Sequence, residues 1–189
     1  MMEGKCIILC APSGAGKTSI TKYLLQQDLG LEFSISACNR DARANETDGV
    51  DYHFLTTESF KSRIDNNEFV EWEEVYTDSY YGTLKTEINR IWDNGKNVIF
   101  DVDVEGGLSL TKHFGEKALA IFIKPPSIEA LEERLRSRGT EDEEKIQKRL
   151  AKAEKELEYS KWFDYIIVND NLENAQQEAF SLIKSFLKN

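Results

Sequence analysis

The residues Ala11 to Thr18, with the sequence APSGAGKT, have the types and spacing of a phosphate-binding loop. They match the pattern G-x-x-x-x-G-K-[ST] except that Ala11 stands at the first glycine. Gly14 and Gly16 let the backbone turn its N–H groups inward around phosphate oxygens, and the N-terminus of a following helix attracts anions. Lys17 can reach the β- and γ-phosphates, and the Thr18 hydroxyl can ligate Mg²⁺. The segment therefore predicts a site for a nucleoside triphosphate.

Two aspartates, Asp101 and Asp103, end a predicted buried strand over Asn97 to Val104. The carboxyl ends of parallel strands border the crevice in which α/β proteins bind ligands. Because side chains two apart in a strand point the same way, both carboxylates are expected to face one site. Asp101 is then suited to hold Mg²⁺ through water, beside the Thr18 hydroxyl.

Arginines form two groups in a chain whose formal net charge is −10. Arg40 and Arg43 follow a short predicted strand, three residues apart. Arg134 and Arg138 lie four residues apart, on one face of a predicted helix, and Arg149 follows on the next helix. Guanidinium groups bind phosphate oxygens in bidentate form and stabilise the charge that develops in phosphoryl transfer. Both groups are therefore candidate phosphate ligands.

The elements that must position these residues alternate between apolar runs and amphipathic stretches, which predicts an α/β fold with a parallel sheet. Buried strands are expected at KCIILC, NVIFDVDV, ALAIFIK and YIIVN, and helices at about 17–27 and 172–187. Residues from about 33 to 90 hold short aromatic-rich runs and predict a small β-rich insertion. Residues from about 127 to 160 predict two charged helices, the first capped by Ser127 and the second by a capping box at Thr140.

Length and composition restrict the class of protein. The 189 residues suffice for one domain with a sizeable core, and 40% hydrophobic with 31% charged residues is typical of a soluble globular chain. No apolar run approaches the roughly 18 residues of a membrane span, and the N-terminus does not resemble a secretory signal. Three cysteines without metal or disulfide spacing favour a reducing cytoplasm. The acidic charge argues against a nucleic acid partner, and the oligomeric state stays open.

In order and spacing, the motifs resemble those of the guanylate kinase family from about residue 5 to the C-terminus. They are APSGAGKT, SISACNRDAR, DGVDYHF, EFVEWEEV, YYGT, DVDVEGG, IFIKPPS, RLRSRGT and VND. The resemblance implies phosphorylation of GMP to GDP by ATP with Mg²⁺, in purine nucleotide metabolism, and leaves open whether dGMP is also accepted. It also implies a three-layer P-loop core (about 1–32, 91–126 and 161–189), a GMP-binding part (about 33–90) and a helical lid (about 127–160).

The resemblance further assigns individual residues. The implied ATP contacts are Ala11, Pro12, Ser13, Gly14, Ala15, Gly16, Lys17, Thr18, Ser19 and Asn169. The implied GMP contacts are Arg40, Arg43, Tyr52 and Tyr81 at the phosphate and Ser36, Glu71, Thr83 and Asp103 at the guanine. The implied catalytic residues are Lys17, Arg40, Arg134, Arg138 and Arg149. A carboxylate at Glu71 suits guanine because it accepts from N1–H and N2–H and repels the lone pair at N1 of adenine.

Two alternative functions stay open at this point. Guanylate-kinase-like domains also serve as protein-binding modules, but these typically have a degraded P-loop, whereas Lys17 and Thr18 are present here. Kinases of phosphorylated sugars have a similar P-loop, but the guanine-reading pattern of Glu71, Tyr81 and Thr83 argues against that activity. Measurement of ADP release with a panel of acceptors discriminates among the three.

Overall fold

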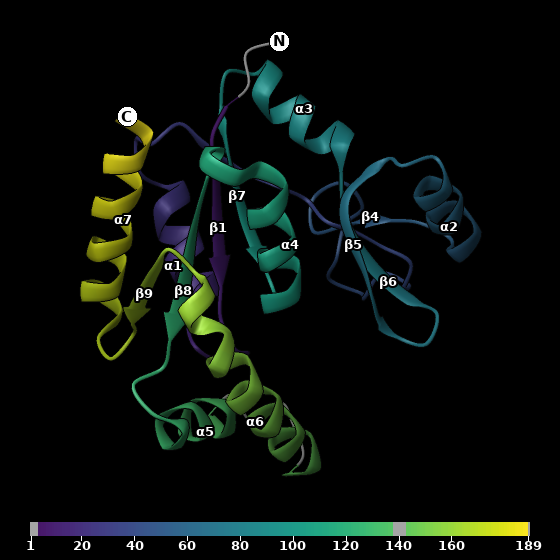
Figure 1. Ribbon diagram of the computed structural model, residues 1–189. Helices are drawn as coiled ribbons and strands as arrows, with labels where there is room; N and C mark the ends of the chain where they lie inside the picture. Colours follow the sequence, from purple (N-terminus) through teal and green to yellow (C-terminus); the bar gives the residue numbers. More distant parts are fainter. Residues whose placement is uncertain (1–3, 138–142, 189) are drawn as a thin grey trace.

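The computed structural model describes residues 4–137 and 143–188, and its centre is a five-stranded sheet in the order β2-β7-β1-β8-β9 (Figure 1). All four strand pairs in this sheet are parallel. The strands are β1 (Cys6–Cys10), β2 (Leu31–Phe33), β7 (Asn97–Val102), β8 (Ala118–Lys124) and β9 (Tyr165–Val168). Because β1 is central and covered on both faces, all of its side chains are buried and apolar, as parallel strands require. The predicted α/β fold is confirmed.

Helices cover both faces of the sheet and complete the three layers. Helices α1 (Lys17–Leu25) and α7 (Leu172–Lys188) pack with Ile7 and Leu9 of β1 on one face. Helices α3 (Lys85–Asp93) and α4 (Val104–Phe114) lie on the other face, where β1 directs Cys6, Ile8 and Cys10. Helix α4 approaches so closely that a Cβ on Gly107 would lie 2.0 Å from the Cys10 sulfur. Only glycine permits this approach.

A second, smaller sheet in the order β4-β3-β6-β5 lies beside the first and corresponds to the predicted β-rich insertion. Its strands are β3 (Ala37–Cys38), β4 (His53–Phe54), β5 (Phe69–Tyr76) and β6 (Ser79–Leu84). Helix α2 (Thr57–Asp65), which the sequence did not predict, packs on it through Phe60, whose ring stacks on Phe69 at 4.4 Å. Phe60 is the one fully buried residue of α2, so the helix has almost no apolar periodicity to reveal it.

Helices α5 (Ile128–Ser137) and α6 (Glu143–Glu158) pack on each other beyond the carboxyl ends of β1 and β8 (Figure 1). They enclose a small core of their own, formed by Leu131, Leu135, Ile146, Leu150 and Ala153. The Ser127 hydroxyl accepts a hydrogen bond from the Ala130 N–H at 3.1 Å, which confirms the predicted first cap. Thr140, the expected start of the second cap, lies outside the described residues. Two short 3-10 helices, η1 (Gly115–Lys117) and η2 (Tyr159–Trp162), lead into β8 and β9.

The predicted strand over Asn97 to Val104 is two residues too long, since β7 ends at Val102. Asp103 is instead the N-cap of α4, and its carboxylate accepts the Gly106 N–H at 3.0 Å. Such a cap ends the strand because it commits the next residues to helix. The helix after the P-loop also ends earlier than predicted, with Gln26 as its C-cap. Among the described residues, no helix has the length and apolar character to cross a membrane.

Candidate active site

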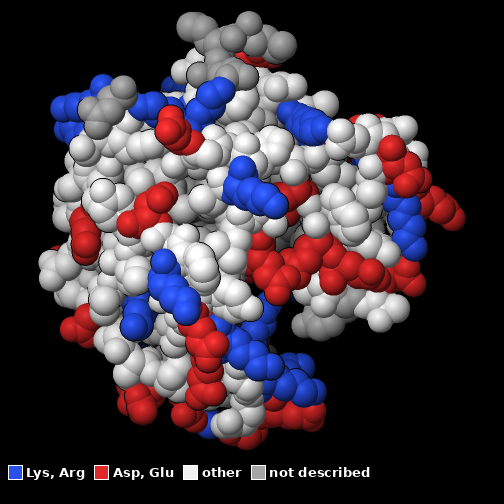
Figure 2. Space-filling model, viewed as in Figure 1, with Lys and Arg blue, Asp and Glu red and all other residues white. Residues whose placement is uncertain are grey.

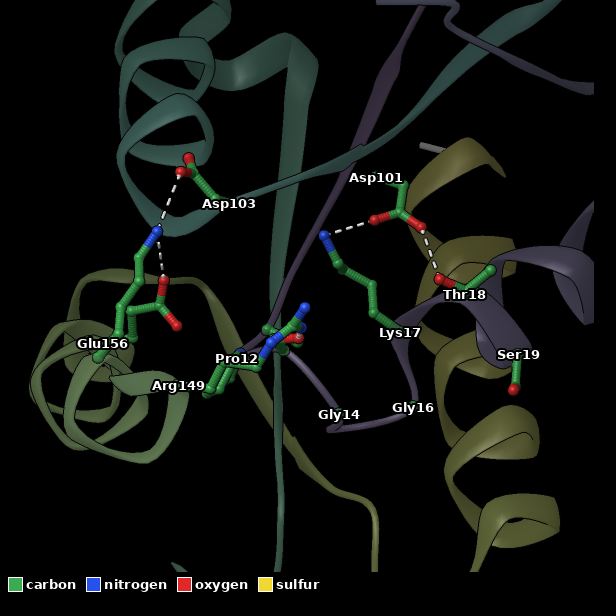
Figure 3. Close-up of a pocket in the computed structure, with 13 residues that line it drawn as sticks. Pro12, Gly14, Gly16, Lys17, Thr18, Ser19, Asp101, Asp103, Arg149 and Glu156 are labelled. Carbon is green, nitrogen blue, oxygen red and sulfur yellow. Dashed lines mark hydrogen bonds and ion pairs between the residues drawn. The ribbon is translucent and has the colours of Figure 1, made fainter. Parts of the chain in front are cut away.

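A cavity of about 320 Å³, here called the P-loop cavity, opens where β1 and β7 end (Figure 3). It is lined by Ala11, Pro12, Ser13, Gly14, Gly16, Lys17, Thr18, Ser19, Asp101, Asp103, Arg149, Lys152 and Glu156. The segment after β1 thus forms one wall, and β7 and α6 contribute the rest. Ala15, also assigned to ATP, is completely buried behind this wall.

The loop backbone turns at Gly14 and Gly16, both with φ of +96°. Outside glycine, positive φ occurs in the described residues only at Asn67 and Asp78, so Ala11 needs no glycine-like conformation. Gly16 is the N-cap of α1 and supplies no side-chain hydrogen bond. The first N–H groups of α1 are therefore left for a ligand, and the helix dipole favours an anion there.

Asn169 contacts the P-loop from outside the cavity and does not line it. Its side chain is buried, and Nδ2 donates to the Ala15 carbonyl at 2.7 Å. A Cβ on Gly16 would lie only 2.3 Å from the same Nδ2, so the amide occupies the space that a side chain at Gly16 would need. Arg134 in turn contacts Asn169, since its Nη2 donates to the Asn169 backbone carbonyl at 2.8 Å. Asn169 and Arg134 thus connect the P-loop to the end of β9 and to α5.

Lys17 and Asp101 form an ion pair at the centre of the P-loop cavity (Figure 3). The Lys17 ammonium also donates to the Val102 carbonyl at 2.5 Å. The Thr18 hydroxyl donates to the second oxygen of Asp101 at 3.4 Å. Asp101 therefore holds both side chains that the P-loop pattern assigns to phosphate and Mg²⁺, in a position from which each can turn to a ligand.

The donor set fits a magnesium ion that arrives with a nucleotide. The Thr18 hydroxyl and the Asp101 carboxylate are hard oxygen donors, which Mg²⁺ prefers, and they are already adjacent. No group of three or more His, Cys, Asp or Glu residues suited to a metal occurs in the part of the chain that the structure describes. Mg²⁺ usually keeps several water and phosphate ligands beside one or two from the protein, so this small set suffices.

Helix α6 brings two cations to the P-loop cavity. The Arg149 guanidinium donates to the Ser13 hydroxyl. Lys152 Nζ lies 3.8 Å from Asp103 Oδ2 and 3.5 Å from Glu156 Oε1. Burial raises the pKa of Glu156, and the Lys152 ammonium opposes that rise. Lys152 and Glu156 were not predicted as site residues, although their spacing of three and seven residues after Arg149 places them on one helical face. Arg138 lies outside the described residues.

A second cavity of about 260 Å³, here called the Glu71 cavity, lies between the small sheet and the end of β7. Its lining residues are Ser36, Tyr52, Glu71, Glu73, Val75, Tyr81, Gly82, Asp101, Val102, Asp103 and Gly106. Asp101 and Asp103 line both cavities, so the two spaces meet at these carboxylates. Figure 2 shows a hollow with acidic side chains along the β5 side and basic side chains along the α6 side.

Glu71 and Thr83 face each other across the β5–β6 pair, and the Thr83 hydroxyl donates to Glu71 Oε1 at 2.7 Å. Thr83 itself is completely buried. Burial raises the pKa of Glu71 to about 7, with a further contribution from Asp103, while the Thr83 hydrogen bond opposes the rise. The second carboxylate oxygen lies near the backbone of Gly106 at the α4 N-terminus. The cavity therefore presents a half-buried hydrogen-bond acceptor whose charge changes near neutral pH.

Arg40 does not line the Glu71 cavity, but it contacts two residues that do, Tyr52 and Tyr81. Its Nε donates to the Tyr81 hydroxyl at 3.1 Å, and its guanidinium carbon lies 4.9 Å from the centre of the Tyr52 ring. Both terminal nitrogens donate to Glu46, at 2.6 and 2.7 Å. The Arg43 side chain is 73% exposed. Glu46 was not predicted as a site residue, although Arg40, Arg43 and Glu46 follow one another at intervals of three residues.

Comparisons with known proteins agree on one family. The family model described as guanylate kinase matches residues 3–186. A guanylate kinase of Bacteroides thetaiotaomicron is 54% identical over 98% of this chain and 91% of its own length. A guanylate kinase of Porphyromonas gingivalis is 52% identical over 97% of this chain and 98% of its own. The crystal structure of guanylate kinase from Anaplasma phagocytophilum superimposes with a TM-score of 0.77 at 26% identity, covering 98% and 87% of the two chains.

Proposed function

The chain belongs to the guanylate kinase family, and from this premise we propose how its two cavities divide the reaction. The protein transfers the terminal phosphoryl group of ATP to GMP and forms ADP and GDP. ATP occupies the P-loop cavity and GMP the Glu71 cavity. The observation that carries this division is that the two cavities meet at Asp101 and Asp103, so that one nucleotide in each cavity would lie in a single continuous site.

GMP lies with its base at Glu71 and its phosphate at Arg40. The Glu71 carboxylate accepts from guanine N1–H and N2–H, and Ser36, Thr83 and Asp103 complete the base site. Arg40 and Arg43 bind the phosphate together with the hydroxyls of Tyr52 and Tyr81. The Arg40–Tyr81 hydrogen bond and the stacking on Tyr52 support this assignment, because they already gather three of the four phosphate ligands.

ATP is held by the backbone N–H groups of the P-loop and of the first turn of α1, with Asn169 fixing the loop from below. Lys17 turns from Asp101 to the β- and γ-phosphates. Arg134 on α5 and Arg149 on α6 add positive charge as the phosphoryl group moves, and Arg138 is assigned the same role. Phosphoryl transfer is direct between the two nucleotides, so the protein contributes positioning and electrostatic stabilisation.

We assign Mg²⁺ to the Thr18 hydroxyl, with Asp101 acting through water, and when bound it neutralises charge on the phosphates of ATP.

Residues of about 33–90 form the GMP-binding part, those of about 127–160 form a lid, and the rest form the core. The separate cores of the small sheet and of the α5–α6 pair support this division, since each can move as a unit. Three free buried cysteines support a reducing, cytoplasmic location.

The test is ADP release from MgATP with a panel of acceptors: GMP, dGMP, AMP and a phosphorylated sugar. GMP is expected to be strongly preferred over AMP, and the sugar phosphate to give no turnover. Preference for the sugar phosphate, or binding of GMP without any ADP release, would overturn the assignment of the cavities. The relatives named guanylate kinase and the intact Lys17 and Thr18 do not favour either alternative.

A further inference from the structure

We propose that Glu46 is a positioning residue that holds Arg40 and Arg43 ready for the phosphate of GMP, an inference that rests on the proposed site of GMP. Glu46 lies on the loop after β3, and its side chain is only 11% exposed although it carries a charge. It contacts both arginines, and these are the two cations assigned to the acceptor phosphate. Nothing else in the described loop gives Arg40 a carboxylate partner.

The contacts of Arg40 show how completely its orientation is determined. A guanidinium has five N–H donors in a fixed plane. Nη1 donates to Glu46 Oε2 at 2.6 Å and to the Asp41 carbonyl at 3.0 Å, and Nη2 donates to Glu46 Oε1 at 2.7 Å. With the Nε–Tyr81 hydrogen bond, four of the five donors are directed to acceptors in the protein. Tyr52 shares a further side-chain hydrogen bond with Arg40, so Glu46 fixes the plane of the guanidinium beside the two tyrosines assigned to the phosphate.

Glu46 also sets the backbone at Arg43. The Arg43 N–H donates to Glu46 Oε2 at 2.9 Å, and the Glu46 N–H donates to the Arg43 carbonyl at 3.0 Å. Arg43 Nη1 lies 3.8 Å from Glu46 Oε1, at the limit of an ion pair. The Arg43 backbone is therefore fixed while its exposed side chain is free to turn to a ligand. One carboxylate thus organises both cations, and its charge reduces their mutual repulsion.

The charge on Glu46 persists at every pH at which the enzyme is assayed. The hydrogen bonds from Arg40 and from the Arg43 backbone lower the pKa of Glu46 to about 2. Two arginines and one glutamate leave one net positive charge facing a phosphate that carries about two negative charges. A carboxylate in this position has two possible effects on GMP: it orients the arginines, or it competes with the phosphate for them. The tyrosine hydroxyl beside Arg40 and the exposed side chain of Arg43 favour orientation, because they offer contacts to the phosphate that do not require GMP to displace Glu46.

The variant Glu46→Gln separates these effects, since it keeps the size of the side chain and removes its charge. Binding of GMP and of guanosine is measured by isothermal titration calorimetry with wild type, Glu46→Gln and Glu46→Asp. We expect GMP to bind roughly 10-fold more weakly to Glu46→Gln, because a charged hydrogen-bond partner is lost, and guanosine to bind unchanged. Glu46→Asp, which keeps the charge, is expected to recover part of the affinity. In turnover assays the KM for GMP rises while the KM for ATP stays constant.

Glu68→Gln is the matched control, because the Arg63–Glu68 pair has the same chemistry at 2.7 Å on the same part of the molecule but lines neither the P-loop cavity nor the Glu71 cavity. It should leave the affinities for GMP and guanosine unchanged. Tighter binding of GMP by Glu46→Gln would show that Glu46 competes with the phosphate for the arginines. Equal weakening of GMP and guanosine binding would show that Glu46 only supports the structure of the site. Either result overturns the inference. If wild type bound GMP no more tightly than guanosine, the proposed phosphate site itself would fail.

Discussion

The P-loop cavity takes most of its lining from one unbroken segment, Ala11 to Ser19, whereas the Glu71 cavity collects residues from Ser36 to Gly106. The first cavity offers backbone N–H groups at a loop and a helix N-terminus, with Lys17 as its central cation. The second offers side chains: Glu71 and Thr83 for a base, and Arg40 with two tyrosines for a phosphate.

The difference follows from what each cavity must recognise. A triphosphate presents many equivalent oxygens, which a local turn with inward N–H groups can bind whatever the side chains are. Guanine and adenine differ in a few donors and acceptors, and only side chains in fixed positions on separate strands can distinguish them. Substitutions should therefore affect turnover most in the P-loop cavity and acceptor choice most in the Glu71 cavity.

The largest effect is expected for Lys17→Ala, with kcat lower by on the order of 10³-fold. The ammonium stabilises charge on the transferring group, and no other cation of the loop can replace it. ADP release measures the effect, and circular dichroism checks the fold. Lys22→Ala, an exposed lysine on the same helix, is the control and should leave kcat unchanged. Turnover of Lys17→Ala within ten-fold of wild type would contradict the assignment of the P-loop cavity to ATP.

Glu71→Gln should lower kcat/KM for GMP by roughly 10²-fold, because one carboxylate oxygen becomes an amide that faces guanine N–H groups. The ratio of kcat/KM for GMP to kcat/KM for AMP should fall at the same time, since the amide can donate to N1 of adenine. Steady-state kinetics with both acceptors gives the ratio.

Arg43→Ala is the control for acceptor choice, because GMP and AMP carry the same phosphate. It should weaken both acceptors about equally and leave their ratio constant. An unchanged GMP-to-AMP ratio in Glu71→Gln would show that Glu71 does not read the base.

Gly16→Ala should raise the KM for ATP roughly 30-fold, through both backbone strain at φ of +96° and the contact with Asn169. Gly95→Ala is a matched control, because Gly95 also has positive φ (+68°) but a Cβ there meets nothing within 4 Å. Gly95→Ala should lower the melting temperature and leave the KM for ATP constant. Equal ATP kinetics in the two variants would mean that Asn169 does not position the loop.

The smallest effect is a pH dependence confined to the Glu71 cavity. Because the pKa of Glu71 is about 7, its ionised fraction rises about ten-fold between pH 6 and pH 8. Guanosine, which lacks the titrating phosphate, should therefore inhibit about ten-fold more strongly at pH 8. ATP binding should not follow the same curve. A flat guanosine profile would contradict recognition by the carboxylate.

The raised pKa of Glu71 also makes the stability of the folded protein decrease as pH rises. Burial raises the pKa of Glu71 above its ordinary value of 4.5, so the folded protein holds this proton more tightly than the unfolded chain does. The stabilisation is complete below about pH 4.5 and is lost as pH rises through 7. Between pH 5 and pH 8, the melting temperature of the ligand-free wild type should fall roughly 5 °C more than that of Glu71→Gln. Differential scanning calorimetry measures this difference.

Local patterns were enough to predict the P-loop and the strands β1, β7, β8 and β9 of the central sheet. Strand β2 was not predicted, and β9, expected to be buried, buries only one of its four residues. The run KCIILC followed by two glycines and Lys17 contains its own strand, turn and helix start, so its geometry depends on neighbours in the chain. The β-rich character of the insertion was also visible in its alternating aromatic runs. Helix α2 was not, because Phe60 is its one fully buried side chain and Ile64 is only partly buried beside it. The end of β7 was placed two residues too late because apolar residues recur as far as Val104, although Asp103 is a local N-cap signal.

The sequence by itself thus determined the fold class, the phosphate loop and the family to which the motifs belong. Only the tertiary structure decided that Asn169 lies under the loop, that Lys152 joins Asp103 to α6, and that Glu46 holds Arg40. The physical reason is distance along the chain and the direction of side chains. A turn and a helix cap arise from adjacent residues, whereas an ion pair or a buried amide depends on which faces of separate elements come together, and that is fixed only when the cores pack.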